Sequence, residues 1–387
     1  MTNSRLLQTE ACRRLGVSLP IVGAPMGGVA GPELAAAVSS AGGLGMLGHA
    51  NSDLAAVREE IRHVKDLIDK PFGVGLLFPT SDRTEPPGLV HEPPQDSPPE
   101  RNPLPLFLRQ FQAVQPAGVP APSRSPRPRR VRPYSLEAAE QRLDIVIEEN
   151  VPVLACGLGT PARVVKRAKA HGIQVIALVG SRRAAVEVEE RGVDIVVAQG
   201  HEAGGHTGRT TTFVLVPQLV DALRIPVLAA GGISDGRQLA AALMLGASGV
   251  LLGTRLLATP EARTADSHKA RVVEMREDDT VVSRCYTGKP SRVLRNAFTD
   301  AWKGHENEIL PMPEQWEMVE PVVAPAKAAG SLTLANWPTG QGAVLVRSIA
   351  PAAEVVRQLA AEAAALISNG GSGGERSDRE GARCSGS

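Results

Sequence analysis

Residues 193–208 read VDIVVAQGHEAGGHTG, an apolar run that leads into a glycine-rich loop with two histidines and a glutamate. The apolar part has the length and composition of a strand buried in a parallel sheet. The loop places the imidazole of His206 at the end of that strand, beside backbone that can close around a ligand because glycine has no side chain. The stretch therefore predicts a parallel-sheet protein with a functional site at a strand end.

Two further apolar runs downstream also end in glycine or hydroxyl residues. Residues 226–233 read PVLAAGGI, and residues 248–254 read SGVLLGT. Glycines at strand ends let backbone N–H groups converge on an anion, because no Cβ atoms stand in the way. The expected anion is a phosphate.

Eight short apolar runs alternate with segments of helical length along the chain. This alternation is typical of repeated strand–helix units, and eight such units close a (β/α)₈ TIM barrel, an α/β fold. The expected strands are residues 20–24, 43–47, 72–78, 151–156, 174–179, 194–198, 226–230 and 249–253. The expected helices are residues 32–40, 54–68, 136–149, 161–170, 182–191, 216–223, 236–245 and 352–367.

The chain divides into a barrel and several appendages. We expect the barrel to comprise residues 1–80 and 134–257, with an insertion at 81–133 after its third strand. This insertion holds 14 of the 31 prolines and has no clear apolar period, which predicts mostly disordered backbone. The other expected regions are a helical lid (258–346), the last barrel helix (347–367) and a disordered Gly/Ser-rich tail (368–387).

Composition limits the kinds of partner and the cellular location that we expect for this protein. The 387 residues carry 42 Lys and Arg against 41 Asp and Glu, so no global charge attracts nucleic acid or an anionic membrane. No apolar stretch approaches the roughly 20 residues that span a bilayer. The four cysteines are far apart and form no CxxC pair, and the N-terminus has no secretory pattern. We expect a cytoplasmic protein without nucleic-acid or membrane partners, with a homo-oligomer left open.

Three motifs have alternative interpretations. Residues 43–48 match the GxGxxG pattern of a dinucleotide site, but the match lies inside an apolar run, which favours a barrel strand. His201, Glu202 and His206 resemble a metal set, yet a five-residue spacing in a glycine loop does not place two ligands on one face, so we expect no metal. Cys156 ends an apolar strand and is predicted to be a small buried residue rather than a nucleophile.

Several ordered blocks of the sequence resemble one family, the nitronate monooxygenases (2-nitropropane dioxygenase-like), and the related FMN-dependent enoyl-acyl-carrier-protein reductases. The resemblance covers most of residues 15–80 and 135–300. The blocks are PIVGAPMGG (20–28), LAAAVSSAGGLG (34–45), EAGGHTG (202–208), AAGGISDG (229–236), GASGVLLGTR (246–255) and TGKPSRVLRN (287–296).

The resemblance implies a TIM barrel that binds FMN at the carboxyl ends of its strands, with His206 as the catalytic histidine. Ala24, Pro25 and Met26 would line the flavin ring. Gly75 departs from the family, which often has an asparagine there. The residues expected to hold the phosphate are Gly204, Ala230, Gly231, Gly232, Gly253 and Thr254, and those expected at the cofactor rim are Thr80, Val179 and Gly180.

The implied reaction is the oxidation of an alkyl nitronate or nitroalkane by oxygen to a carbonyl compound and nitrite. The substrates would be a small molecule and oxygen, and His206 would act as a base or hold the substrate anion. One alternative is an NAD(P)H-dependent FMN reductase of the enoyl-thioester or quinone type. Another is a non-catalytic flavin-binding scaffold that recruits partners through the charged, proline-rich insertion.

Overall fold

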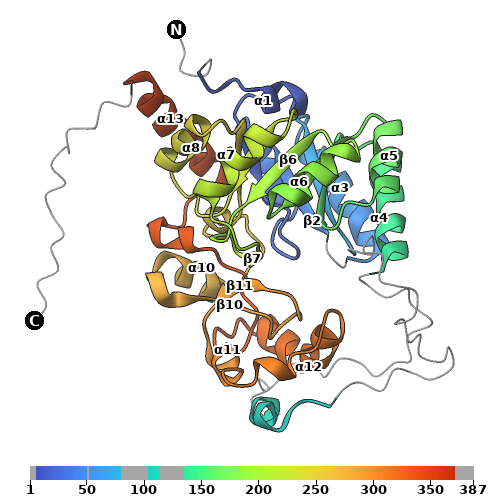
Figure 1. The fold of residues 1–387 in the computed structure, drawn as a ribbon, viewed down its shortest axis with the longest axis vertical. Helices are drawn as coiled ribbons and strands as arrows, with labels where there is room; N and C mark the ends of the chain where they lie inside the picture. Colours follow the sequence, from blue (N-terminus) through green and yellow to red (C-terminus); the bar gives the residue numbers. More distant parts are fainter. Residues whose placement is uncertain (1–5, 50–51, 80–102, 114–134, 371–387) are drawn as a thin grey trace, which may run out of the picture.

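The structure, a computed structural model, describes residues 6–49, 52–79, 103–113 and 135–370. Eight parallel strands form one sheet in the order β1-β9-β8-β6-β5-β4-β3-β2. Val22 of β1 bridges to Leu44, just before β2, so the sheet curves into a nearly closed TIM-like barrel (Figure 1). The strands are β1 (Ile21–Gly23), β2 (Gly45–His49), β3 (Phe72–Phe78), β4 (Val153–Leu158), β5 (Gln174–Val179), β6 (Ile195–Gln199), β8 (Val227–Ala230) and β9 (Gly249–Leu252). The eight-stranded parallel barrel predicted from the alternating pattern is confirmed.

Helices cover the outside of the barrel. Side chains cap the N-termini of several of them: Asp53 accepts a hydrogen bond from the N–H of Ala56, and Asp235 and Gln238 form a capping box. The helices are α2 (Pro32–Ser40), α3 (Leu54–Leu67), α4 (Leu136–Glu148), α5 (Ala162–Ala170), α6 (Arg182–Glu190), α7 (Thr212–Ala222), α8 (Gly236–Met244) and α13 (Ala352–Ser368).

Helix α7 begins four residues before the expected start at residue 216. The carboxylate of Glu202 accepts hydrogen bonds from the N–H and hydroxyl groups of Thr212, at 2.9 Å and 3.0 Å, and so satisfies the first turn of the helix. Sequence periodicity did not reveal this start, because the capping carboxylate comes from a loop ten residues earlier.

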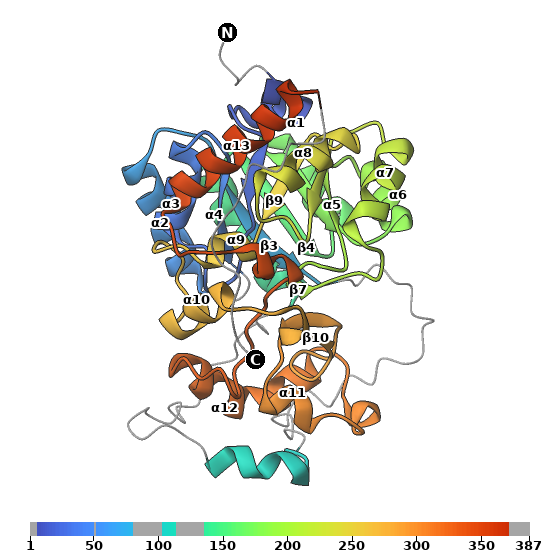
Figure 2. The same cartoon turned by 90° about the vertical axis from the view of Figure 1, so that its left-hand side faces the viewer.

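The barrel interior is closed at the end away from the site by a short helix, α1 (Glu10–Leu15). Ala11 and Leu15 are buried there in a cluster with side chains from all around the barrel, including Met46 and Ile176. Figures 1 and 2 show α1 at one end of the barrel and the lid at the other. The described side chains thus fill the barrel interior at the α1 end.

The segment expected to be a helical lid is helical only in part. It contains α10 (Asp266–Val273), α11 (Ala297–Ala301) and α12 (Glu314–Ala328), but also the antiparallel strands β10 (Thr280–Ser283) and β11 (Ser291–Leu294). Strand β11 pairs with β7 (Gly205–His206), the glycine loop after β6. The remaining short elements are α9 (Thr254–Leu257), η3 (Glu277–Asp279), η4 (Glu306–Glu308) and η5 (Gln341–Leu345).

Within the predicted insertion, the structure describes residues 103–113, and these pack on the lid. Residues 106–113 form a 3₁₀ helix, η2 (Leu106–Ala113), whose Leu108 is completely buried in the lid core. The Phe107 ring stacks on His305 and meets Trp302 edge-on. Figure 2 shows η2 beneath α11 and α12. The rest of 81–133, and the tail after residue 370, lie outside the described residues.

Candidate functional site

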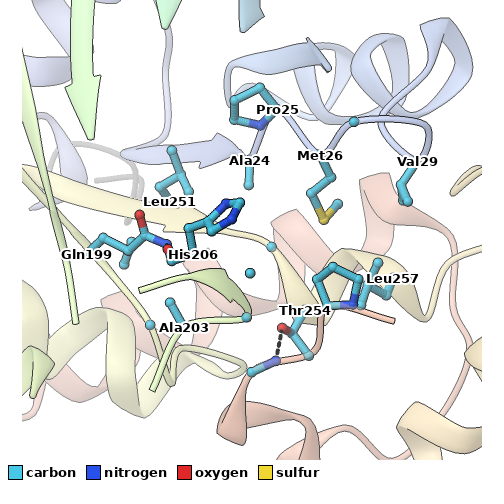
Figure 3. A pocket seen from close by; sticks show the side chains of 18 of the residues that line it. Ala24, Pro25, Met26, Val29, Gln199, Ala203, His206, Leu251, Thr254 and Leu257 are labelled. Carbon is cyan, nitrogen blue, oxygen red and sulfur yellow. Dashed lines mark hydrogen bonds between the residues drawn. The ribbon is translucent and has the colours of Figure 1, made fainter. Parts of the chain in front are cut away.

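A cavity of about 280 Å³ lies at the carboxyl ends of the barrel strands, between the barrel and the lid. Its lining is mostly apolar, with a few polar groups that point inward, as is typical of a ligand site. In Figure 3 the His206 ring lies near Ala24 and Leu251, and Met26 and Thr254 lie farther along the barrel side of the cavity. The cavity belongs to both regions of the molecule, so a ligand in it would touch barrel and lid together.

Glycines after β8 and β9 form one wall of the cavity. Gly231 and Gly232 have φ angles of +104° and +75°, which other residues rarely adopt. Within the described part of the chain, the backbone N–H groups of Gly232, Gly253 and Thr254 donate to no other group. Unused N–H groups around a space without Cβ atoms can bind the oxygens of a phosphate.

A segment near the end of the lid, residues 337–342, closes over these glycines. The N–H of Gly340 donates to Oγ1 of Thr254 at 2.9 Å, the bond drawn in Figure 3. A Cβ on Gly204 would lie 2.7 Å from the nitrogen of Gly340, so the two backbones touch directly. Sequence analysis missed Gly340 and Gly342, because their partners lie far away in the chain.

His206 lies on β7, where the barrel loop pairs with the lid. Its backbone carbonyl accepts a hydrogen bond of 2.9 Å from the side chain of Gln199 at the end of β6. Its Nε2 lies 3.1 Å from Oγ1 of Thr287, in the turn between β10 and β11. The barrel thus holds the backbone of His206 and the lid holds its imidazole, and the residue lines the cavity.

The surroundings of His206 keep its imidazole neutral. Burial, with a smaller contribution from the positive charge of Lys289, lowers the pKa of His206 to about 4. Near neutral pH the ring therefore carries no positive charge. It can donate a hydrogen bond from one nitrogen and accept one, or a proton, at the other.

The lid contributes a second histidine, which no sequence motif singled out. His268 on α10 is 1% exposed and lines the cavity with Trp337 and Lys327. Its ring centroid lies 4.7 Å from that of Trp337, and Nζ of Lys327 lies 5.5 Å from the Trp337 ring centroid. No local sequence pattern marks these residues, because three separate segments bring them together.

Most of the residues proposed from the sequence meet at this cavity. Val179 and Gly180 do not line it: the Val179 side chain packs in the outer core, and Gly180 packs against Gly208. Thr80 lies outside the described residues. Those that line the cavity are Ala24, Pro25, Met26, Gly204, His206, Ala230, Gly231, Gly232, Gly253 and Thr254. Their individual roles remain predictions.

The departure from the family pattern at Gly75 has a steric reason. Gly75 lines the cavity, and a Cβ at this position would lie 2.1 Å from Cβ of Pro25 and 2.6 Å from its Cγ. An asparagine cannot fit on this backbone unless Pro25 moves. The Pro25 ring therefore occupies the place that a side chain at residue 75 would need.

The remaining candidates have structural roles. Glu202 caps α7, and Nδ1 of His201 lies 2.9 Å from the carbonyl oxygen of Gly208. The described residues contain no cluster of His, Cys, Asp and Glu suited to a metal ion. Cys156 is completely buried, and burial raises its pKa to about 12, so its thiol is unreactive. Likewise, none of the described helices has the length and apolar character needed to span a membrane.

Comparisons with known proteins agree with this geometry. The family model described as nitronate monooxygenase matches residues 10–362. A protein named "Probable nitronate monooxygenase" from Staphylococcus saprophyticus is 32% identical over 353 residues, covering 88% of this chain and 94% of its own length.

Two solved structures are similarly close. FabK from Thermotoga maritima has a TM-score of 0.74 and 32% identity, covering 94% of this chain and 98% of its own. Nitroalkane oxidase from Streptomyces ansochromogenes has a TM-score of 0.74 and 30% identity, covering 93% of this chain and 99% of its own. The family match spans both the barrel and the lid. The chain is therefore an oxidoreductase that belongs to the nitronate monooxygenase family.

Proposed function

We propose that this protein is an FMN-dependent enzyme that oxidises alkyl nitronates, and more slowly nitroalkanes, with oxygen to a carbonyl compound and nitrite. The observation that carries the proposal is a neutral imidazole, His206, in a mostly apolar cavity next to a glycine wall with unused N–H groups. Family membership makes a flavin the expected cofactor, and the glycine wall suits a single phosphate.

The residues present fit FMN. A Cβ at Gly253 would approach only Ala24 and Met26, at 3.6 Å and 3.8 Å, so the space above this glycine is open toward the cavity. Gly232, Gly253 and Thr254 would bind the phosphate, and Ala24, Pro25 and Met26 would lie along the ring. Bound flavin supplies the redox chemistry between the substrate and oxygen.

The charge state of His206 bears on which substrate is preferred. A group with a pKa of about 4 is a weak base, so it would remove the α-proton of a neutral nitroalkane slowly. A nitronate arrives without that proton, so its oxidation needs no base. Its negative charge would raise the pKa of His206, and the ring, once protonated at the nitrogen that faces the cavity, would donate a hydrogen bond to the anion. This favours the nitronate.

Oxygen consumption by the purified yellow protein tests the proposal. A panel of alkyl nitronates and the matching neutral nitroalkanes is compared, with nitrite measured as product. We expect oxygen uptake and nitrite release with the nitronates, at higher rates than with the neutral forms. No turnover of any nitronate would contradict the proposal, and FAD or a stoichiometric metal in place of FMN would contradict the cofactor.

The second candidate is an NAD(P)H-dependent reductase, which the similarity to FabK supports. Anaerobic mixing with NADPH separates the two functions. Rapid loss of the flavin colour with NADPH would favour the reductase, whereas loss of colour only with a nitronate would favour the oxidation that we propose.

A further inference from the structure

We propose that Thr287 is a positioning residue that holds His206 as the tautomer with its proton on Nε2, which leaves Nδ1 as the atom that takes the substrate proton. The inference rests on the proposed function for its chemical meaning. The tautomer itself can be measured without any substrate.

The tautomer of His206 follows from the hydrogen bonds that the Thr287 hydroxyl makes. Thr287 is 8% exposed, and its Oγ1 lies 3.1 Å from Nε2 of His206. The same oxygen donates to the carbonyl of Lys289 at 3.2 Å and accepts from the N–H of Lys289 at 3.3 Å. One hydroxyl therefore has three neighbours in the turn between β10 and β11.

Only one proton is available on that hydroxyl, so the three contacts restrict each other. If Thr287 donates to the Lys289 carbonyl, its oxygen can accept both from Lys289 N–H and from a proton on Nε2 of His206. If Thr287 donated to Nε2 instead, the bond to the Lys289 carbonyl would be lost. The arrangement that satisfies every contact has the proton on Nε2.

The other nitrogen of His206 faces the cavity. Nδ1 makes no hydrogen bond to any described residue, and His206 lines the cavity wall. With Nε2 protonated, Nδ1 has a free lone pair. When a nitroalkane binds, its α C–H bond would break, the electron pair would move into the nitro group, and the proton would form a new N–H bond at Nδ1.

A second threonine–histidine arrangement in the same cavity is a natural comparison. His268 has Nδ1 at 2.9 Å from Oγ1 of Thr264 and Nε2 at 2.9 Å from Oγ1 of Thr339. Because Thr339 donates to the carbonyl of Trp337, His268 must donate from Nε2, and its Nδ1 accepts from Thr264. Both nitrogens of His268 are thus occupied, and it has no lone pair for a substrate.

Long-range ¹H–¹⁵N NMR spectra of the full flavin-loaded chain, labelled at histidine, test the assignment. At pH 7 we expect a protonated Nε2 and an unprotonated Nδ1 for His206. In Thr287→Val the single tautomer should give way to a mixture, and turnover of a neutral nitroalkane should fall about tenfold with little change in KM. Thr287→Ser keeps the hydroxyl and should restore both. Thr264→Val serves as the matched spectral control and should change the signals of His268 but not those of His206.

A wild-type spectrum with the His206 proton on Nδ1 would overturn the inference, even if Thr287→Val failed to fold. An unchanged tautomer in a folded Thr287→Val protein, or a Thr287→Ser protein that behaves like it, would also overturn it. If the wild-type enzyme oxidised neither nitroalkane nor nitronate, the proposed function would fail while the tautomer could still be measured. The two failures are therefore distinguishable.

Discussion

The two walls of the cavity differ in how the chain builds them. The barrel wall consists of glycines and His206 at the ends of consecutive strands, so each piece is local in sequence. The lid wall consists of His268, Lys327 and Trp337, and His268 lies more than fifty residues before the other two. The difference teaches that the barrel wall of this cavity can be recognised from local motifs, whereas the lid wall depends on contacts that no local motif encodes.

The largest expected effect compares the histidines of the two walls. His206→Asn should lower turnover of a neutral nitroalkane by about 10²-fold or more, because asparagine cannot accept the α-proton. His268→Asn should lower it much less, because both nitrogens of His268 are already bonded to threonines. Steady-state oxygen uptake measures both, with FMN content as the control. An equal loss of turnover in both variants would mean that His268 contributes to proton transfer as much as His206.

Next in size is the contribution of η2 to the lid. Leu108→Ala should lower the free energy of unfolding by about 2 kcal/mol, because Leu108 is completely buried and its removal leaves a cavity in the lid core. Leu106→Ala is the matched control, since Leu106 is 76% exposed, and it should change little. Urea unfolding measures both variants. If neither substitution mattered, η2 would not stabilise the lid.

A smaller effect is expected at the glycine wall. Gly253→Ala should weaken FMN binding about tenfold, roughly 1.4 kcal/mol, without destabilising the apoprotein. Its φ of −105° suits alanine, and the added Cβ meets other atoms only at 3.6 Å or more. Gly232→Ala is the contrasting variant, because its φ of +75° strains any L-residue and should also lower apoprotein stability. Flavin fluorescence titration and thermal melting separate the two effects.

The effect that is smallest at neutral pH concerns the buried histidines. His49, His206 and His268 each have a pKa lowered to about 4, mainly by burial. Because the unfolded histidines titrate near 6.5, the unfolded chain binds more protons between pH 6.5 and 4, and stability falls as the pH drops through this window. We expect Tm to be constant above pH 6.5 and to decrease steadily toward pH 4. His268→Asn should reduce the slope, and a Tm independent of pH would contradict these pKa values.

The sequence predicted the barrel strands with small errors in their boundaries. Strand β2 begins at Gly45 rather than at residue 43, and β1 is shorter than expected, yet every strand lies where an apolar run predicted it. Each strand is specified by a few adjacent residues, and a parallel strand buried on both faces leaves a clear apolar run. The packing of η2 on the lid could not be predicted from the sequence, because Leu108 is buried by segments far away in the chain.

Ten of the thirteen proposed site residues line the cavity, because they follow barrel strands whose carboxyl ends meet at one face. The sequence by itself thus determined the parallel barrel, the glycine wall and the position of His206 at a strand end. Only the tertiary structure decided that Pro25 fills the space above Gly75, that lid residues form the facing wall, and that Thr287 contacts Nε2 of His206. The physical reason is that strand patterns and glycine turns depend on neighbouring residues, whereas a histidine tautomer depends on a hydroxyl 81 residues away.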